Sequence, residues 1–489
     1  MIYLTSSGAH LDESDGVEYL AITKNIVDNH SIKLPANSDI YVKTGLNETN
    51  KIKSFISSQT GTPVDQIHNL NDVYAPYGLV LSFMAVPLYY LASLIHAEPI
   101  HFVPFFLNPI VLSLTSLVIF LTAKEIFSSY RISFILCIVF GVCSFIWPYI
   151  NTMWQQPLVG LVLISSLYFL LLSGHTKKSY YVILSAILLG SEIFVHPGLI
   201  IVIPGMLIFS LYVLAKRKTN LKIYFLSFLP FVVLQGMLNK IRFGSILDFG
   251  YQQFEGLNVH SGTEGILGLI MSTGYGIIFY FPLFLLVPIS IYFIYRNYSK
   301  SLSLLIVFEF VSVWIFFGTL EHPLWSFGNW GPRYFTTILP LLTLPLGAFL
   351  VKCKEKISWK IIFIVLSVAG FSINILGILV WHMYGLSYGW EVDGLSNLKD
   401  SWYVFTWNPY YSPIVQAIKV LNSNYLSHVP GIHTNTYQII GLAPCKYDNY
   451  LYCNYNILYN LILGILIGMV FLLLKRKIIR NNLTTATRS

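Results

Sequence analysis

Long apolar runs separated by short polar segments dominate the chain from residue 101 onward. A helix needs about 20 apolar residues to cross the hydrocarbon core of a bilayer. The runs that meet or approach this length are 101–123, 132–150, 157–173, 180–195, 197–215, 223–238, 276–295, 302–319, 334–351, 360–381 and 456–474. This pattern predicts an all-α polytopic membrane protein with about eleven transmembrane helices.

The polar segments between these runs alternate in charge. One set, together with the C-terminal tail, holds 19 of the 30 Lys and Arg residues, and its only acidic residues are Glu125 and Glu355. The other set comprises 151–157, 239–265, 321–333 and 382–455, and it holds six Lys and Arg residues. Because Lys and Arg are retained in the cytoplasm, the first set is predicted to be cytoplasmic and the second external.

The composition agrees with a bundle that lies mostly in lipid. Hydrophobic residues make up 55% of the chain, charged residues 11%, and the mean hydropathy is +0.65. Soluble domains keep about 25% of their residues charged. The net charge of +8 comes from the short cytoplasmic loops, so it indicates orientation in a bilayer and not a nucleic-acid partner.

The segment 77–97 is apolar, uncharged and long enough to span. If it spans, residues 1–76 are cytosolic. If it lies along the outer face or re-enters, residues 1–76 are external, and a first helix upstream of Met1 is then missing from this chain. Composition alone leaves both arrangements open.

Four carboxylates fall within residues 11–20: Asp12, Glu13, Asp15 and Glu18. Carboxylates so close raise one another's pKa and are suited to general-base chemistry or to cation binding. The alternative is an acidic helix start, since Asp and Ser favour the N-cap and acids suit the first turn.

Arg333 is the only Lys or Arg in its external loop and stands where the chain enters lipid. An arginine there can bind a phosphate with two parallel hydrogen bonds, or it can extend toward lipid headgroups without a specific partner. Arg242 lies in an external segment with Lys240 and Asp248, where paired structural charges are the alternative to ligand binding. His196 precedes a proline at a helix break and is either a structural hydrogen-bonding residue or a ligand for an anionic headgroup.

Two further features are open on sequence alone. Glu309 stands in the middle of an apolar run, where a charge is costly unless it is paired or neutral. Cys445 and Cys453 frame a polar stretch of the last external loop. They are either a disulfide in an oxidising compartment or two unpaired thiols.

These motifs, in this order, resemble the GT-C superfamily of polyprenyl-phosphate-sugar-dependent glycosyltransferases, which includes the protein O-mannosyltransferases and the lipid A aminoarabinose transferases. In that superfamily an external Asp is followed four residues later by an aromatic residue, as Asp15 is followed by Tyr19. The Glu that usually follows the Asp is Gly16 here, while an Asp-Glu pair occurs at Asp12 and Glu13.

Four more blocks carry the resemblance along the chain: YAPYGLVLSFMAVPLYYLASL, IWPYI with WQQPLVGLVLI, RFGSILDFGY and NWGPRYFTTILPLL. The chain departs from the superfamily at two positions. Gln156 replaces an acidic residue before a proline, and His196-Pro197 stands where some relatives have Arg-Pro.

The resemblance implies a GT-C-like bundle with external juxtamembrane segments. It places an acidic-motif loop and juxtamembrane segment at 1–100, the transmembrane core at 101–381, and an external loop or small subdomain at 382–455. The last transmembrane helix and a basic cytoplasmic tail then occupy 456–489. Under this interpretation 1–76 and 382–455 share the external side, and 77–97 does not cross the membrane as a straight helix.

The activity it implies is transfer of a sugar from a polyprenyl-phosphate donor to an acceptor hydroxyl at the external face of the plasma membrane. The acceptor is a glycan, a lipid or a protein, and some members use a divalent cation while others do not. The implied site residues are, as catalytic carboxylates, Asp15, Asp12 and Glu13; as ligands of the donor phosphate, Arg333, Arg242 and His196; and, around the substrate, Tyr19, Trp330 and Tyr334.

Two other functions fit the composition. One is a transporter or flippase of lipid-linked sugars, and the other is a polysaccharide polymerase or ligase. An enzyme needs carboxylates and cations that converge at one external site, whereas a transporter needs polar groups along a path through the midplane.

Overall fold

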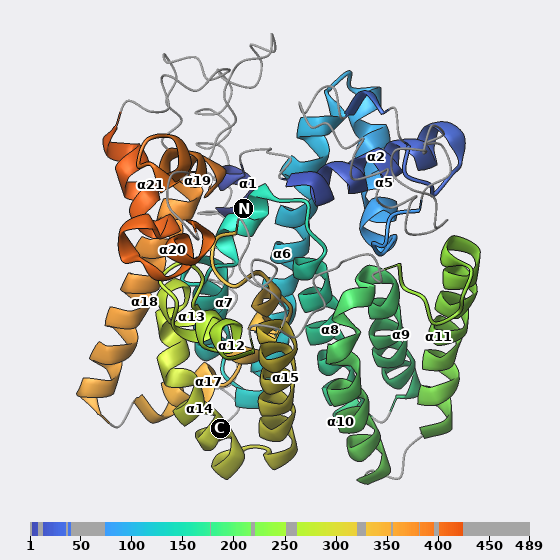
Figure 1. The fold of residues 1–489 in the computed structure, drawn as a ribbon. Coiled ribbons are helices and arrows are strands. Elements are labelled where there is room, and N and C mark those ends of the chain that lie inside the picture. The colour runs from blue at the N-terminus through green and yellow to red at the C-terminus, as the bar shows by residue number, and fades with distance from the viewer. Residues whose placement is uncertain are drawn as a thin grey trace.

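The computed structural model describes residues 2–7, 13–35, 38–40, 74–176, 178–216, 221–250, 262–319, 329–353, 356–380, 382–395 and 401–423. These residues form helices joined by short connections, and no β-strand lies among them (Figure 1). The predicted fold class, an all-α polytopic membrane protein, is confirmed.

Within the described residues, six helical segments are long and apolar enough to cross a membrane. They are α6 (Pro99–Phe127), α8 (Gln156–Thr176), η3 (Pro197–Val202) continued by α10 (Ile203–Lys216), α11 (Leu221–Phe243), α15 (Lys300–Gly318) and α18 (Ile357–Leu379). The shorter apolar segments are α5 (Val80–Leu94), α7 (Tyr130–Val142), α9 (Ser179–Val195), η4 (Pro282–Leu286) with α14 (Val287–Asn297), and α16 (Leu339–Thr343) with α17 (Leu346–Lys352).

The remaining described elements are short or polar. They are α1 (Ile2–Ser6), α2 (Glu13–Asn29), η2 (Trp147–Asn151), α12 (Gly262–Met271), α13 (Ile277–Tyr280), η5 (Arg333–Thr337), α19 (His382–Glu391), α20 (Ser401–Trp407), η8 (Pro409–Tyr411) and α21 (Pro413–Asn422).

Ten of the eleven predicted spans overlap these helices, and the eleventh, 456–474, lies outside the described residues. Three of these ten predicted spans are not continuous α-helices. The run 132–150 is α-helical to Val142 and continues into the 3₁₀ helix η2, and 276–295 and 334–351 are each divided into shorter helices. Proline accounts for the last two divisions, because Pro282 and Pro340 lack an amide N–H and their rings clash with the preceding turn.

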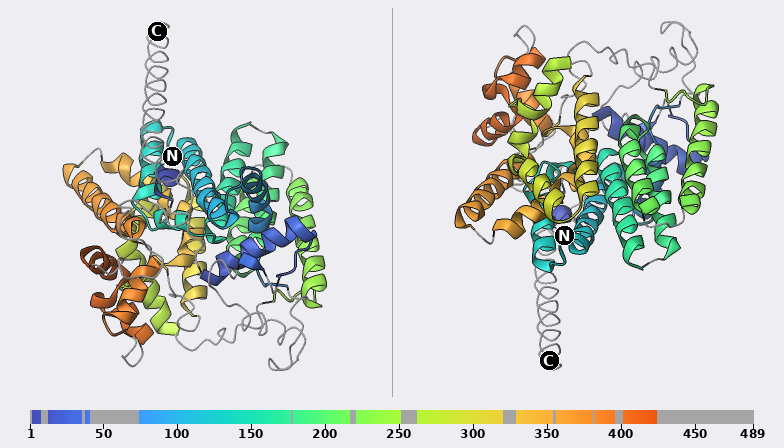
Figure 2. Two further views of the ribbon diagram at one scale, coloured as in Figure 1. Left: turned by 90° about the horizontal axis from the view of Figure 1, so that it is seen from above. Right: turned by 90° about the horizontal axis from the view of Figure 1, so that it is seen from below.

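The spans pack side by side in the bundle. α8 packs against α6 and α9, and α9 packs against α11. α2 runs roughly across the long axes of the spans, over one end of the bundle (Figures 1 and 2). α5 and the helices α19–α21 lie at that same end, so the described parts of 1–76 and 382–455 are found together there (Figure 1).

α5 is the observed form of the ambiguous segment 77–97. It has 15 residues and contains Pro87. At about 1.5 Å per residue it is roughly 22 Å long, which is shorter than the bilayer core of about 30 Å. Two hydrogen bonds join it to α2, because Ser82 Oγ donates to the Tyr19 carbonyl at 3.0 Å and Thr23 Oγ1 donates to the Ser82 carbonyl at 3.2 Å.

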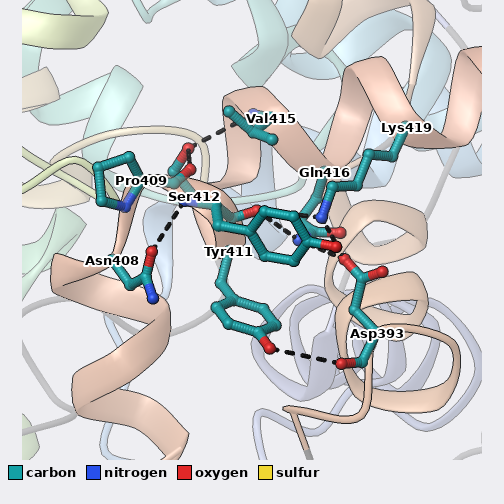
Figure 3. A network of polar contacts seen from close by, with 9 residues as sticks. Asp393, Asn408, Pro409, Tyr411, Ser412, Val415, Gln416 and Lys419 are labelled. Carbon is teal, nitrogen blue, oxygen red and sulfur yellow. Dashed lines mark hydrogen bonds and ion pairs between the residues drawn. The ribbon is translucent and has the colours of Figure 1, made fainter.

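The described part of the loop 382–455 has its own polar network (Figure 3). The Asp393 carboxylate accepts from Gln416 Nε2 at 3.1 Å and forms an ion pair with Lys419. Ser412 caps α21 by accepting from the Val415 amide at 3.4 Å. Beneath this network a small apolar cluster forms around Phe405, separate from the main core. Cys445 and Cys453 lie outside the described residues.

Candidate active site

An ion pair between Asp15 and Arg333 lies at the end of the bundle that α2 covers. Arg333 Nη2 is 2.8 Å from Asp15 Oδ2. The Asp15 side chain is 22% exposed and the Arg333 side chain 14%. The contact joins the carboxylate and the guanidinium that were predicted separately as catalytic base and phosphate ligand, although they are 318 residues apart.

Asp15 is held by a second donor. The Tyr77 hydroxyl donates to Asp15 Oδ1 at 3.0 Å, so each carboxylate oxygen has a partner. Burial, and then the charge of Asp15, raise the pKa of Tyr77 well above its ordinary value. Tyr77 therefore stays protonated near neutral pH and donates to the carboxylate.

Tyr19 was predicted to contact substrate, but in this structure it is buried. Its ring meets the Tyr77 ring edge-on, with centroids 5.0 Å apart. Tyr19 thus supports Tyr77, which in turn holds Asp15.

The Arg333 guanidinium has two further partners near the start of α8, Trp154 and Gln156. Its Cζ atom lies 4.2 Å from the centroid of the Trp154 ring, within cation–π distance. With the Gln156 amide oriented so that its oxygen faces Arg333, that oxygen accepts from Arg333 Nε at 3.1 Å and from Nη2 at 3.2 Å. A carboxylate, an amide oxygen and an aromatic face therefore fix the plane of the guanidinium.

The chain enters η5 through a turn that requires glycine. Gly331 has a φ of +78°, a conformation that other residues adopt at a cost, and a Cβ atom there would lie 2.9 Å from the Tyr280 ring. Trp330 anchors the same turn from the core, where its Nε1 donates to Asn374 Oδ1 at 3.1 Å. Trp330 was predicted to bind substrate, but in this structure it is buried and supports the turn that presents Arg333.

The segment that carries Tyr77 is fixed from three sides. Gln155 Nε2 donates to the Gly78 carbonyl at 2.6 Å. Arg242 Nη2 donates to the Tyr77 carbonyl at 2.8 Å and also to the carbonyl of Ala75. The backbone of Gly78 lies so close to α9 that an added Cβ would be 2.1 Å from the Val195 carbonyl oxygen. Arg242, predicted as a phosphate ligand, holds the backbone of this segment in the structure.

His196 follows the last residue of α9 and lies beside Gln156, whose amide is 3.3 Å from His196 Nε2. Burial, and then the neighbouring Arg333, lower the pKa of His196 to about 3. The imidazole is therefore neutral near pH 7. It was predicted to help neutralise a phosphate, but in this arrangement it can offer a hydrogen bond and no positive charge.

The lowered pKa of His196 predicts a loss of stability in acid. The unfolded chain takes up a proton near the ordinary value of 6.5, whereas the folded chain does not until about pH 3. Between pH 7 and pH 5 this difference should lower the free energy of unfolding by about 2 kcal/mol. Denaturation of the detergent-purified protein at pH 7 and at pH 5 measures this change in the free energy of unfolding. His196→Gln should flatten the dependence, while His175→Gln, at an exposed site, should not. An unchanged slope in His196→Gln would contradict the assignment.

The other predicted residues have different places. Tyr334 is half-buried and stacks on Phe317, with ring centroids 3.6 Å apart and planes at 9°. Asp12 and the side chain of Glu13 lie outside the described residues, so their roles stay predictions. Among the residues that the structure describes, no three His, Cys, Asp or Glu side chains gather in a way that could hold a metal ion.

Trp154 and Tyr77 were not predicted as site residues. Both stand in blocks that carry the resemblance, WQQPLVGLVLI and YAPYGLVLS, so the signal was present in the sequence. Which aromatic residue of each block faces the site depends on how the blocks pack, and a motif does not contain that information.

The apolar helices and their arrangement define a multi-pass helical membrane protein. No family model and no curated protein match the sequence. Comparison with solved structures finds the crystal structure of ArnT from Cupriavidus metallidurans bound to undecaprenyl phosphate, at 12% identity and a TM-score of 0.49. The matched region covers 82% of the present chain and 64% of the ArnT chain. At this identity the similarity concerns the fold alone.

Proposed function

We propose that this protein is a membrane glycosyltransferase that moves a sugar from a polyprenyl-phosphate donor to an acceptor hydroxyl at the external face. The observation that carries the proposal is the Asp15–Arg333 pair, a carboxylate and a guanidinium 2.8 Å apart at one end of an apolar bundle. A base and a cation side by side are what displacement at a lipid-linked phosphate needs.

Arg333 is suited to the donor phosphate. The guanidinium fork matches the oxygens of a phosphate, and Trp154 and Gln156 already fix its plane. Gln156 is also the first residue of α8, so the positive end of that helix dipole lies close by. These features together favour an anion, and in the structure the anion that contacts Arg333 is Asp15.

In the proposed reaction the donor phosphate competes with Asp15 for Arg333. The carboxylate that it displaces turns to the acceptor and accepts the proton of the acceptor hydroxyl. The acceptor oxygen then forms a bond to the anomeric carbon as the bond from that carbon to the phosphate oxygen breaks. The polyprenyl phosphate leaves with the electron pair of that bond, and Arg333 stabilises its charge. Tyr77 keeps Asp15 oriented, and neutral His196 adds no charge that would compete with Arg333.

Purified protein in liposomes with a panel of polyprenyl-phosphate sugars tests the proposal. Release of polyprenyl phosphate, with transfer of the sugar to an added acceptor or slowly to water, is the expected result for at least one donor. If every donor survives intact while a labelled lipid-linked sugar crosses the bilayer, the protein is a transporter.

A transport function has one observation in its favour. Glu192 in α9 and Glu309 in α15 are fully buried in spans and close enough to interact electrostatically. Carboxyl groups at such depth often mark ion or proton paths. Against this, the Asp15–Arg333 pair is at the bundle end, and neither buried glutamate forms an ion pair within the described part of the chain. A polymerase or ligase would use the same site, so the transfer assay includes it.

A further inference from the structure

A cavity of about 520 Å³ lies between α7 and α18. The helix α18 stands at the edge of the bundle (Figures 1 and 2). Its volume is in the range of about 300–1,000 Å³ that small-molecule sites occupy. The residues that line it include Arg131, Ile135, Cys143, Lys360 and Val368. None of them belongs to the candidate active site.

The two cations stand at the same end of this cavity. Arg131 lies in the first turn of α7 and Lys360 in the first turn of α18, and both helices follow loops of the basic set. Both residues are exposed, and neither has a carboxylate within ion-pair distance in the part of the chain that the structure describes. Their charges are therefore available to a ligand at the side that the charge rule assigns to the cytoplasm.

Below the cations the wall is apolar. Ile135, Val139 and Phe363 continue it into the bundle, and Ser367 is already satisfied because its hydroxyl donates to the Phe363 carbonyl at 2.7 Å. From Arg131 to Cys143 the helix rises roughly 18 Å, at about 1.5 Å per residue. One leaflet of a bilayer core is about 15 Å deep, half of the whole, so the cavity reaches about as far as one acyl chain.

The cavity is open toward lipid. Ile138 on α7 and Ile364 and Val368 on α18 are among the exposed large hydrophobic residues, and α18 is mostly unburied along its length. A ligand can therefore enter sideways from the membrane.

From these observations we propose that the cavity binds an anionic glycerophospholipid of the cytoplasmic leaflet. The phosphate group of the lipid lies against Arg131 and Lys360, and one acyl chain fills the apolar part. This site is independent of the proposed transferase activity and is at the opposite end of the spans from Asp15.

Native mass spectrometry of the full-length protein tests the site. The protein is equilibrated in mixed micelles with equal amounts of phosphatidylglycerol and phosphatidylcholine, and the retained lipids are counted. We expect preferential retention of phosphatidylglycerol. Each removed cation, in Arg131→Gln and in Lys360→Gln, should reduce that retention about fivefold. The matched control is Lys222→Gln, at the basic start of α11 and outside the cavity, which should leave it unchanged.

Ser367→Trp fills the apolar part and keeps both cations. Retention of phosphatidylglycerol should be lost while elution as a folded protein is unchanged. Three results would overturn the proposal. One is equal retention in all variants, and another is equal retention of both lipids by the wild type. The third is a disulfide, formed in native membranes of the Leu474→Cys variant, between the introduced cysteine and Cys353. That disulfide would show that the predicted last span, 456–474, fills the cavity.

Discussion

Asp15→Asn should lower sugar transfer by roughly 10²–10⁴-fold, the contribution that a positioned general base makes. The amide keeps the size of the carboxylate and can still accept from Tyr77 or Arg333, so the fold should persist. It cannot accept the acceptor proton. Initial rates in liposomes, compared at equal protein level, measure the effect.

The matched control is Asp28→Asn, on the same helix α2 but exposed and paired with Lys24 at 3.3 Å. It should transfer sugar at the wild-type rate. Asp12 is the rival base, because it carries the adjacent Glu13 that the superfamily pattern contains. Should Asp12→Asn abolish transfer while Asp15→Asn leaves it intact, the motif is aligned three residues too late. If neither matters, the acidic cluster is a helix start and the enzymatic proposal fails.

Arg333→Ala should reduce transfer by about 10²–10³-fold, the usual cost of removing a donor that stabilises a developing oxyanion. Arg333→Lys keeps the charge but loses the planar fork that contacts Asp15, Gln156 and Trp154 at once. Its rate should lie between those of the wild type and the alanine variant, with a raised KM for the lipid donor.

Arg296→Ala is the control for a general loss of arginine, since Arg296 lies in the last turn of α14 and is exposed. Its kinetics should match the wild type. Arg333→Ala with unchanged donor turnover would show that Arg333 only supports Asp15 or reaches lipid headgroups. The proposed reaction would then need another cation to stabilise the charge of the leaving phosphate.

The spans were predictable because hydrophobic length is a local property. Runs such as 101–123 and 360–381 correspond closely to α6 and α18. The break before Pro282 was not predicted, although this proline marks it. A hydropathy window averages over one proline, whereas the helix loses a hydrogen bond at that residue.

The site was only partly predictable for a different reason. Asp15 and Arg333 could each be selected by residue type and neighbours, but nothing local indicates that they touch. The state of His196 was not predictable either, because its pKa is lowered by burial and by Arg333, and both arise only in the folded bundle. Gln156 was noted as a departure from the superfamily, and its contact with Arg333 gives that departure a physical meaning. A neutral amide oxygen there holds the guanidinium without adding a second negative charge beside it.

The sequence separation of the central ion pair also sets the order of events during biosynthesis. Ribosomes add about 5–20 residues per second, so on the order of 15–60 s pass between the synthesis of Asp15 and that of Arg333. During that interval the growing chain has inserted the helices from α6 to α15 without the partner of its first carboxylate. The site is completed only when η5 reaches its place, so a chain halted before that point holds most of its membrane helices and has no ion pair at the site. Assembly in this order makes the Asp15–Arg333 contact a late event in the folding of the nascent protein.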